Sequence, residues 1–236
     1  MSLILALDTA TNFVGVALGD ADGIVGVATV AAPRQHAEVM VPTIVEVLAA
    51  AGVEMSQVSA LAVGVGPGLF TGLRVGVTTA IVMAEALAVP LVAVSSLELV
   101  AAGCHSDQRI VVVLDAKRSE VFHATFHYHG SSLIRDRIDA VADPSALVSE
   151  LIEESAARAG GLMLMGDGVA TYPEVFSLIP NANIGAPEFW MPSATALVKI
   201  AAERIARGEV DSPRTVVPNY LRESDAVLPT ERVVSR

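Results

Sequence analysis

The sequence contains one cysteine, few aromatic residues and few charges. Aromatic residues make up 4% of the 236 positions and charged residues 17%, whereas hydrophobic residues make up 53%. The single cysteine, Cys104, excludes an intrachain disulfide framework, and its type is usually a small buried core residue. The high apolar content argues against a disordered chain. A chain of this length forms one large domain or two modest ones.

Basic residues are also scarce, and they are not clustered. The 15 Lys and Arg residues stand against 26 Asp and Glu residues, which gives a formal net charge of -11. Neutralisation of phosphates by basic side chains supplies most of the affinity of proteins for nucleic acids. The sequence therefore argues against a protein that holds a nucleic acid by itself, and any such contact is expected to pass through a partner.

The chain has neither a signal-peptide pattern nor a convincing membrane span. The apolar run at the N-terminus has no basic residue before it and ends at Asp8. A second apolar stretch, residues 75–94, contains Glu85, which would cost about 2.5–3.5 kcal/mol in a bilayer, and Pro90. We expect a helix followed by a strand there, no membrane contact and a cytoplasmic protein.

The first half alternates short apolar runs with turn residues, which predicts an α/β fold. Gly52 is a typical signal for the end of a helix, and a glycine-rich turn follows the fourth strand. The predicted strands are residues 3–8, 14–19, 24–30, 61–65 and 91–94, and the predicted helices are 35–51, 71–88 and a short one from Ser96.

The second half repeats this pattern after a polar stretch at residues 104–108. Asp8 and Asp115 each end an apolar strand and precede a turn and a returning strand. The repeat predicts two duplicated βββαβα subdomains, 1–104 and 105–236, in an actin-like, sugar-kinase-like architecture. The last helix could also pack back on the first subdomain. The predicted elements are a hairpin at 110–115 and 120–128, a helix at 144–159, a strand at 162–165 and a helix at 193–207 capped by Ser193.

Two helices of the first half are more apolar than one sheet can cover. Almost every position of helix 71–88 is apolar or glycine, apart from Arg74 and Glu85 along one edge. Such a helix is covered nearly all round, either by the sheet and a neighbouring helix or by a partner protein. The predicted partner-binding residues are Met40, Ile44, Val47, Arg74, Val77, Ile81 and Glu85.

Residues 64–74 read Gly-Val-Gly-Pro-Gly-Leu-Phe-Thr-Gly-Leu-Arg and lead from a strand into a helix. Glycines let the backbone approach closely, and a helix N-terminus can bind an anion; the alternative is a tight strand-to-helix joint. In a second glycine turn, Asp167 would repel phosphate, so no nucleotide is expected in the isolated chain. The candidate cleft or phosphate-loop residues are Asp8, Thr9, Thr11, Gly66, Gly68, Thr71, Asp115, Lys117 and Arg118.

Several dispersed motifs together resemble the TsaB family. Residues 64–74 look like its GPGSFTGLR signature, and residues 8–11, Asp-Thr-Ala-Thr, resemble its opening strand and turn. Residues 34–38, Arg-Gln-His-Ala-Glu, are similar to its first-helix pattern. Residues 115–121 resemble its DAR-x-x-EVY hairpin, and residues 218–222 its P-x-YLR ending. The series runs in the same order over most of the chain.

This resemblance implies a non-catalytic subunit. TsaB is a shortened paralogue of TsaD, the transferase that uses threonylcarbamoyl-adenylate to modify the adenosine beside the anticodon of tRNAs that read ANN codons. The family's members pair with TsaD through helices of their N-terminal half, and the ATPase TsaE joins them. We therefore expect no cofactor, contact with tRNA only through the complex, and a homodimer when the partner is absent.

The resemblance also implies a departure from TsaD in metal binding. TsaD carries two histidines four residues apart on a helix, and the aligned positions here hold Ser96 and Val100, which argues against a metal. His123 and His127 share that spacing but fall in a strand, where it spans over 10 Å. An actin-like ATPase or kinase and, less favoured, a glycoprotease-like metallopeptidase stay open as alternatives.

Overall fold

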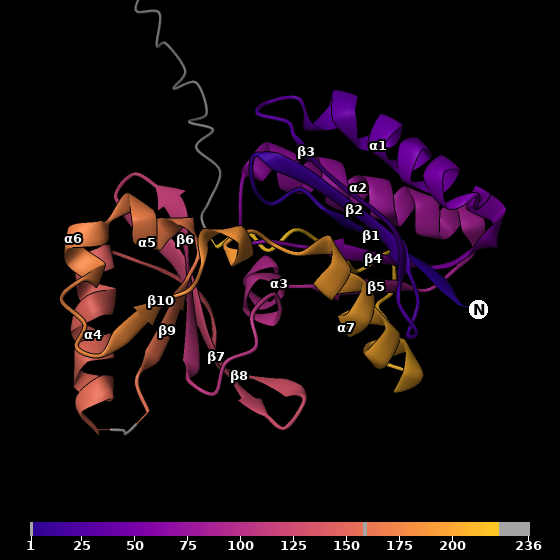
Figure 1. Ribbon diagram of the computed structural model, residues 1–236. Coiled ribbons are helices and arrows are strands. Elements are labelled where there is room, and N and C mark those ends of the chain that lie inside the picture. Colours follow the sequence, from indigo (N-terminus) through magenta and orange to yellow (C-terminus); the bar gives the residue numbers. More distant parts are fainter. Residues whose placement is uncertain (1, 158–159, 222–236) are drawn as a thin grey trace, which may run out of the picture.

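The computed structural model describes residues 2–157 and 160–221, which form two five-stranded sheets side by side (Figure 1). The first sheet has the order β3-β2-β1-β4-β5 and the second the order β8-β7-β6-β9-β10. In each half the first three strands pair with one another in antiparallel fashion, in chain order. The last two strands of the half run parallel to its first strand. The duplicated α/β architecture expected from the sequence is therefore confirmed.

The elements of the first half follow the expected order closely. They are β1 (Leu3–Asp8), β2 (Phe13–Gly19), β3 (Ile24–Ala31), α1 (His36–Ala51), a 3₁₀ turn (Met55–Gln57), β4 (Val58–Gly64), α2 (Phe70–Leu87), β5 (Leu91–Val94) and α3 (Ser96–Ala102).

The second half contains three elements that the sequence pattern did not indicate: β10 and the short helices α5 and α6. The repeat implied the third strand, β8, but did not give its position. Ser193 caps the last helix through Ala196 N, as expected. The elements are β6 (Arg109–Lys117), β7 (Glu120–His129), β8 (Ser132–Ala142), α4 (Pro144–Ala157), β9 (Leu162–Met165), α5 (Asp167–Thr171), α6 (Pro173–Phe176), β10 (Ala182–Ile184), a 3₁₀ turn (Pro187–Phe189) and α7 (Ala194–Ala206).

The first sheet is covered on both faces, which explains its continuous apolar runs. Successive side chains of β1 point to opposite faces: Leu5 and Leu7 pack under α1 and α2, whereas Ile4 and Ala6 pack against α7 on the other face. All four are at most 2% exposed. This sandwich positions the C-terminal ends of β1 and β4 next to the N-termini of the helices.

The last helix of each half packs on the sheet of the other half. Leu97 and Val100 of α3 lie in one core cluster with Ile110 and Phe126 of the second sheet. In return, α7 follows β10 in the chain but packs against β1, β2 and β4 (Figure 1). Each of these two cores therefore contains residues from both sides of the proposed boundary between residues 104 and 105.

Candidate functional site

Asp8 lies at the C-terminal end of β1 with its carboxylate turned into the protein. The residue is 3% exposed. Its Oδ1 accepts a hydrogen bond from Ala10 N at 3.1 Å, and its Oδ2 accepts one from Ser96 Oγ at 3.0 Å. Ser96 Oγ also accepts a hydrogen bond from Gly66 N at 3.2 Å. The carboxylate therefore joins β1 and the start of α3, and through Ser96 the glycine segment.

The turn after Asp8 is held by the N-terminal ends of α1 and α2. Thr9 Oγ1 donates to Gly72 O at 2.8 Å, and Ala10 O accepts from Leu69 N at 2.7 Å. The Nε2 of His36, which is 3% exposed, lies 2.7 Å from Thr11 O. These contacts fix residues 9–11 in one position against both helices.

Three glycines of residues 64–74 face Asp8 and this turn, whereas Gly66 faces Leu73 and Asn219. A Cβ on Gly64 would lie 1.8 Å from Asp8 Oδ2, and a Cβ on Gly68 would lie 2.3 Å from Ala10 O. A Cβ on Gly72 would lie 2.2 Å from Thr9 O. Distances this short are not tolerated, so these positions need glycine because the chain itself packs there. Of the two interpretations of the motif, the contacts favour the tight strand-to-helix joint.

The remaining cleft candidates lie around a cavity of ≈ 110 Å³ between the two halves, whose wall includes Thr11, Gly68, Asp115, Lys117 and Asp167. Lys117 Nζ lies 2.5 Å from Asp115 Oδ2, and Asp167 Oδ1 accepts from Asp115 N at 3.0 Å. Burial, aided by the Asp115 charge, raises the pKa of Asp167. A cavity with two carboxylates and one neutralised lysine is a poor phosphate site. Neither Thr71 nor Arg118 is among the residues that line it, and both are exposed.

The burial of Asp8 should make the protein less stable as the pH rises. Burial raises the pKa of Asp8 from 3.8 to about 6, against the lowering effect of its hydrogen bonds from Ala10 and Ser96. The folded protein therefore keeps this proton at a pH where the unfolded chain has lost it, so the free energy of unfolding falls between pH 4 and pH 6. At roughly 1.4 kcal/mol per pH unit, the total fall is about 3 kcal/mol.

We expect urea denaturation to show this fall as a difference between the protein and its Asp8→Asn variant, which lacks the titration. Relative to the variant, the protein should lose about 3 kcal/mol of stability from pH 4 to pH 7 and little more above that. Parallel stability curves for the two proteins would contradict the burial of a titrating carboxyl at this position.

The positions compared with the TsaD histidines are both buried. Ser96 is hydrogen-bonded to Asp8 as described, and Val100 lies in the core cluster beneath α3. His123 and His127 both lie in β7, as expected for a hairpin. The Nδ1 of His127 pairs with Asp136 at 2.8 Å. Within residues 2–157 and 160–221, no group of three or more His, Cys, Asp or Glu residues is placed to hold a metal ion.

Four residues predicted to bind a partner are instead part of the chain's own core. The first sheet covers one side of each helix, and the largest apolar side chains lie on that side. Ile81 is half-buried, and Arg74 and Glu85 are exposed. The predicted interface is therefore corrected at four positions. Met40, Ile44, Val47 and Val77 are 1–3% exposed and pack between α1, α2 and the first sheet.

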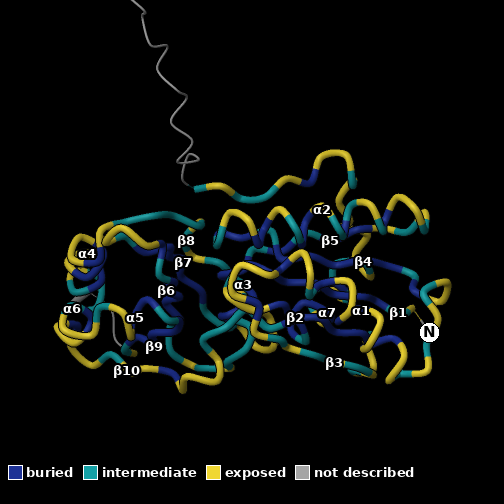
Figure 2. The backbone as a smooth tube through the Cα atoms, turned by 90° about the horizontal axis from the view of Figure 1, so that it is seen from above, coloured by how far each residue is buried: buried dark blue, intermediate teal, exposed yellow. Residues whose placement is uncertain are grey.

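The exposed apolar surface of α1 and α2 lies beside those residues. Val41, Val45 and Val82 are 57–58% exposed, and Figure 2 shows exposed segments along both helices. Val41 and Val45 are four residues apart and therefore lie on one side of α1, and Arg74 and Val82 are both exposed on α2. We call Val41, Val45, Arg74 and Val82 the outer face. At its end, Arg74 Nε donates to Tyr220 Oη at 3.0 Å, a contact that the sequence did not indicate.

Comparisons with known proteins agree with this geometry. Residues 17–229 match the family described as TsaD, tRNA N6-adenosine threonylcarbamoyltransferase. The chain is 29% identical to the tRNA threonylcarbamoyladenosine biosynthesis protein TsaB of Escherichia coli, over 94% of this chain and 96% of that protein. The TsaB protein of Bacillus subtilis is 27% identical, with 94% and 95% covered. The solved structure of YeaZ from Pseudomonas aeruginosa superposes with a TM-score of 0.82 at 30% identity, covering 94% and 100% of the two chains.

The chain belongs to the TsaB family. Its membership confirms the resemblance inferred from the dispersed motifs, and the superposition extends that agreement to the whole fold. The glycine segment, the buried Asp8 turn and the outer face are therefore features of a TsaB-family chain.

Proposed function

We propose that the chain is the non-catalytic partner of a TsaD-type threonylcarbamoyltransferase in the synthesis of threonylcarbamoyladenosine in ANN-decoding tRNAs, and that it acts in the cytoplasm. The outer face of α1 and α2 supports this proposal most directly. Six of the 18 residues of α2 are buried, and a helix this apolar needs further cover in its working state. A paralogue with a similar face is a suitable occupant.

The enclosed turn at residues 8–11 argues against catalysis by this chain. A nucleotide-hydrolysing site needs an open position for phosphate and its cation, whereas Asp8 is buried and hydrogen-bonded to Ser96. The cavity above it is small and carries two carboxylates. The proposal therefore assigns nucleotide chemistry to the partners, including a TsaE-like ATPase, and leaves tRNA to contact this chain only through the complex.

The length and composition of α2, Phe70–Leu87, would also allow it to cross a membrane, and it alone among the described helices has this property. Several observations favour protein contact instead. Its buried side forms part of the core with β4 and β1, and Arg74 and Glu85 interrupt its exposed side. In the absence of the partner, we propose that the outer face pairs with that of a second copy, since two-fold pairing is the commonest assembly.

Reconstitution of tRNA modification tests the proposal. Supplied with threonylcarbamoyl-adenylate as the donor and with ATP, the TsaD-type and TsaE-type proteins of the same organism should modify an ANN-decoding tRNA when this chain is added, and little without it. The isolated chain should neither transfer the threonylcarbamoyl group nor hydrolyse ATP. Full modification without the chain would exclude a required subunit, and ATP turnover by the chain alone would favour the actin-like ATPase.

A further inference from the structure

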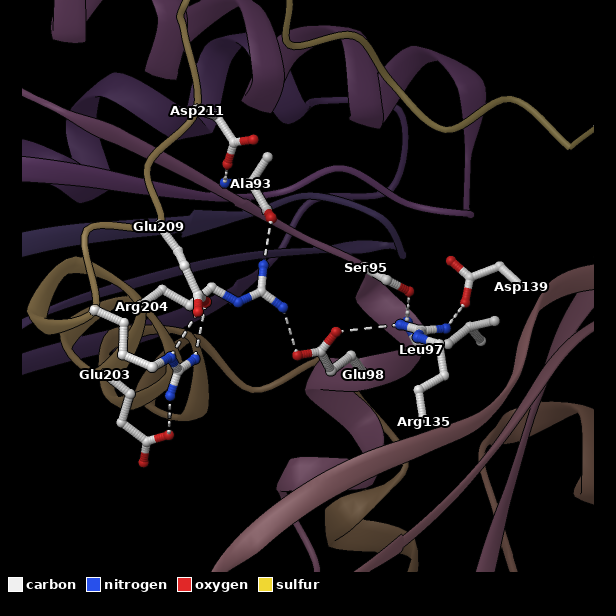
Figure 3. A network of polar contacts seen from close by, with 11 residues as sticks. Ala93, Ser95, Leu97, Glu98, Arg135, Asp139, Glu203, Arg204, Glu209 and Asp211 are labelled. Atoms are coloured by element: carbon white, nitrogen blue, oxygen red, sulfur yellow. Dashed lines mark hydrogen bonds and ion pairs between the residues drawn. The ribbon is translucent and has the colours of Figure 1, made fainter.

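Where α3 and α7 cross between the two halves, Leu99 packs against Leu197 and Val198, and the carboxylate of Glu98 supplies the ion pair between the two helices. Figure 3 shows it between two guanidinium groups. Its Oε1 lies 2.8 Å from Arg204 Nη2 of α7, and its Oε2 lies 3.2 Å from Arg135 Nη2 of β8. One side chain of α3 thus contacts the helix that covers the first sheet and an edge strand of the second sheet.

Both guanidinium groups continue the network. Arg204 Nη1 donates to Ala93 O in β5 at 2.9 Å. Arg135 pairs with Asp139, and its guanidinium carbon lies 4.6 Å from the centre of the Phe126 ring. The network therefore reaches from the edge of the first sheet to the inner face of the second.

The far end of the network returns to the first half. Asp139 Oδ2 accepts a hydrogen bond from Asn219 Nδ2 at 3.0 Å. The backbone N of Asn219 donates to Val65 O, just after β4, at 2.7 Å. The two halves are thereby joined by polar contacts at both ends of Glu98's network.

The charges make Glu98 the essential member. Its side chain is 19% exposed, and those of Arg135 and Arg204 are 26% and 25% exposed, so solvent screens the three charges only partly. If Glu98 were uncharged, Arg204 would keep its hydrogen bond to the carbonyl of Ala93 but would lose its ion pair within this network. The two guanidinium groups would then face each other without a shared counter-ion.

Two cores that are each covered by a helix from the other half can move relative to one another only if those helices slide. Such sliding of packed helices is the shear type of domain motion. We propose that Glu98 is a latch that fixes the crossing of α3 and α7 and so holds the two halves of the chain at one angle. With the latch closed, the outer face and the second sheet move as one body.

A distance measurement between the halves tests the latch. Ala49→Cys in α1 and Ser149→Cys in α4, both at exposed positions, carry spin labels in a chain that also contains Cys104→Ser. Pulsed electron paramagnetic resonance then measures the distance between the labels, which depends on the angle between the halves. The labelled protein that keeps Glu98 should give one narrow distribution of distances. Glu98→Gln should shift it and broaden it about twofold, because α3 and α7 would then be free to slide past each other.

Glu203→Gln is the matched control. It removes the same charge from α7, where the Glu203 side chain is 68% exposed and its ion pair with Arg207 is 4.0 Å long. This variant should leave the distribution unchanged. Circular dichroism establishes that each variant is folded; should Glu98→Gln not fold, Arg204→Gln removes one arm of the latch and should broaden the distribution as well. The proposal is overturned if the folded latch variant gives the same distance distribution as the Glu203→Gln control.

Discussion

Val82→Asp is expected to abolish binding of the TsaD-type partner while the fold survives. Val82 is 57% exposed in the chain, so the new carboxylate is solvated in the free protein. In the complex it would be buried without a counter-charge, which costs several kcal/mol. At 1.4 kcal/mol per factor of ten, isothermal titration calorimetry should show a loss of affinity of at least about 100-fold.

Val27→Asp is the matched control for this prediction. Val27 is 55% exposed and lies in β3. The neighbouring Gly26 faces Val47 of α1, so Val27 points to the opposite side of the sheet. The control should bind as the unsubstituted chain does. Equal affinities for all three proteins would show that the interface lies elsewhere, although the family assignment would stand.

Ile44→Asp would be the wrong variant for this purpose. Ile44 is 3% exposed and packs against the first sheet. An uncompensated carboxylate there would destabilise the fold itself by several kcal/mol, so that lost binding would say nothing about the interface. The sequence alone would have suggested this substitution, because Ile44 and Val45 share one broad apolar arc of the helix.

Gly68→Ala is expected to destabilise the protein by about 3 kcal/mol, near the upper end of overpacking effects. The new Cβ would lie 2.3 Å from Ala10 O, 2.8 Å from Ala10 Cβ and 2.9 Å from Ala10 C. None of these atoms is the end of a flexible side chain, and the turn that carries them is held by hydrogen bonds to Leu69 and Gly72. Thermal or urea unfolding measures the loss.

Gly23→Ala is the corresponding control. Gly23 lies in the exposed turn between β2 and β3, and a Cβ there would meet no atom within 4 Å. Its stability should stay within about 0.5 kcal/mol of that of the unsubstituted protein, as is usual for surface changes. If Gly68→Ala were as stable as this control, residues 8–11 would not be packed against the glycine segment, and an anion-binding role for that segment would regain support.

The architecture could be predicted because its signals are local and repeated. Short apolar runs between turn residues gave the strands of the first sheet, and the recurrence of a strand ending in Asp8 and again in Asp115 indicated the duplication. The repeat implied a third strand in the second half, but the position of β8 was not predicted. Burial along β8 alternates regularly, but Arg135 and Arg137 take less exposed positions whereas Ile138 is 79% exposed. The apolar alternation by which a half-buried strand is recognised is therefore missing.

The candidate site was only partly predictable, because its residues meet through tertiary packing. The motif at residues 64–74 pointed to a special backbone, but its purpose depends on Thr9 and Ala10, which lie more than 50 residues earlier in the chain. In the same way, the apolar arc of α1 extends over more of the helix than the sheet covers. The sequence shows the arc, and the position of the sheet decides that Met40 is buried and Val41 is not.

The exchange of α3 and α7 also affects the order in which the protein can fold during synthesis. The first sheet is complete once β5 has been made, but its second face waits for α7, about 100 residues later. Until then Ile4, Ala6 and Val92 lack the helix that covers them in the finished protein. A ribosome-bound nascent chain that ends near residue 104 should therefore expose an apolar sheet face, and such a fragment should bind chaperones more strongly than the full-length chain.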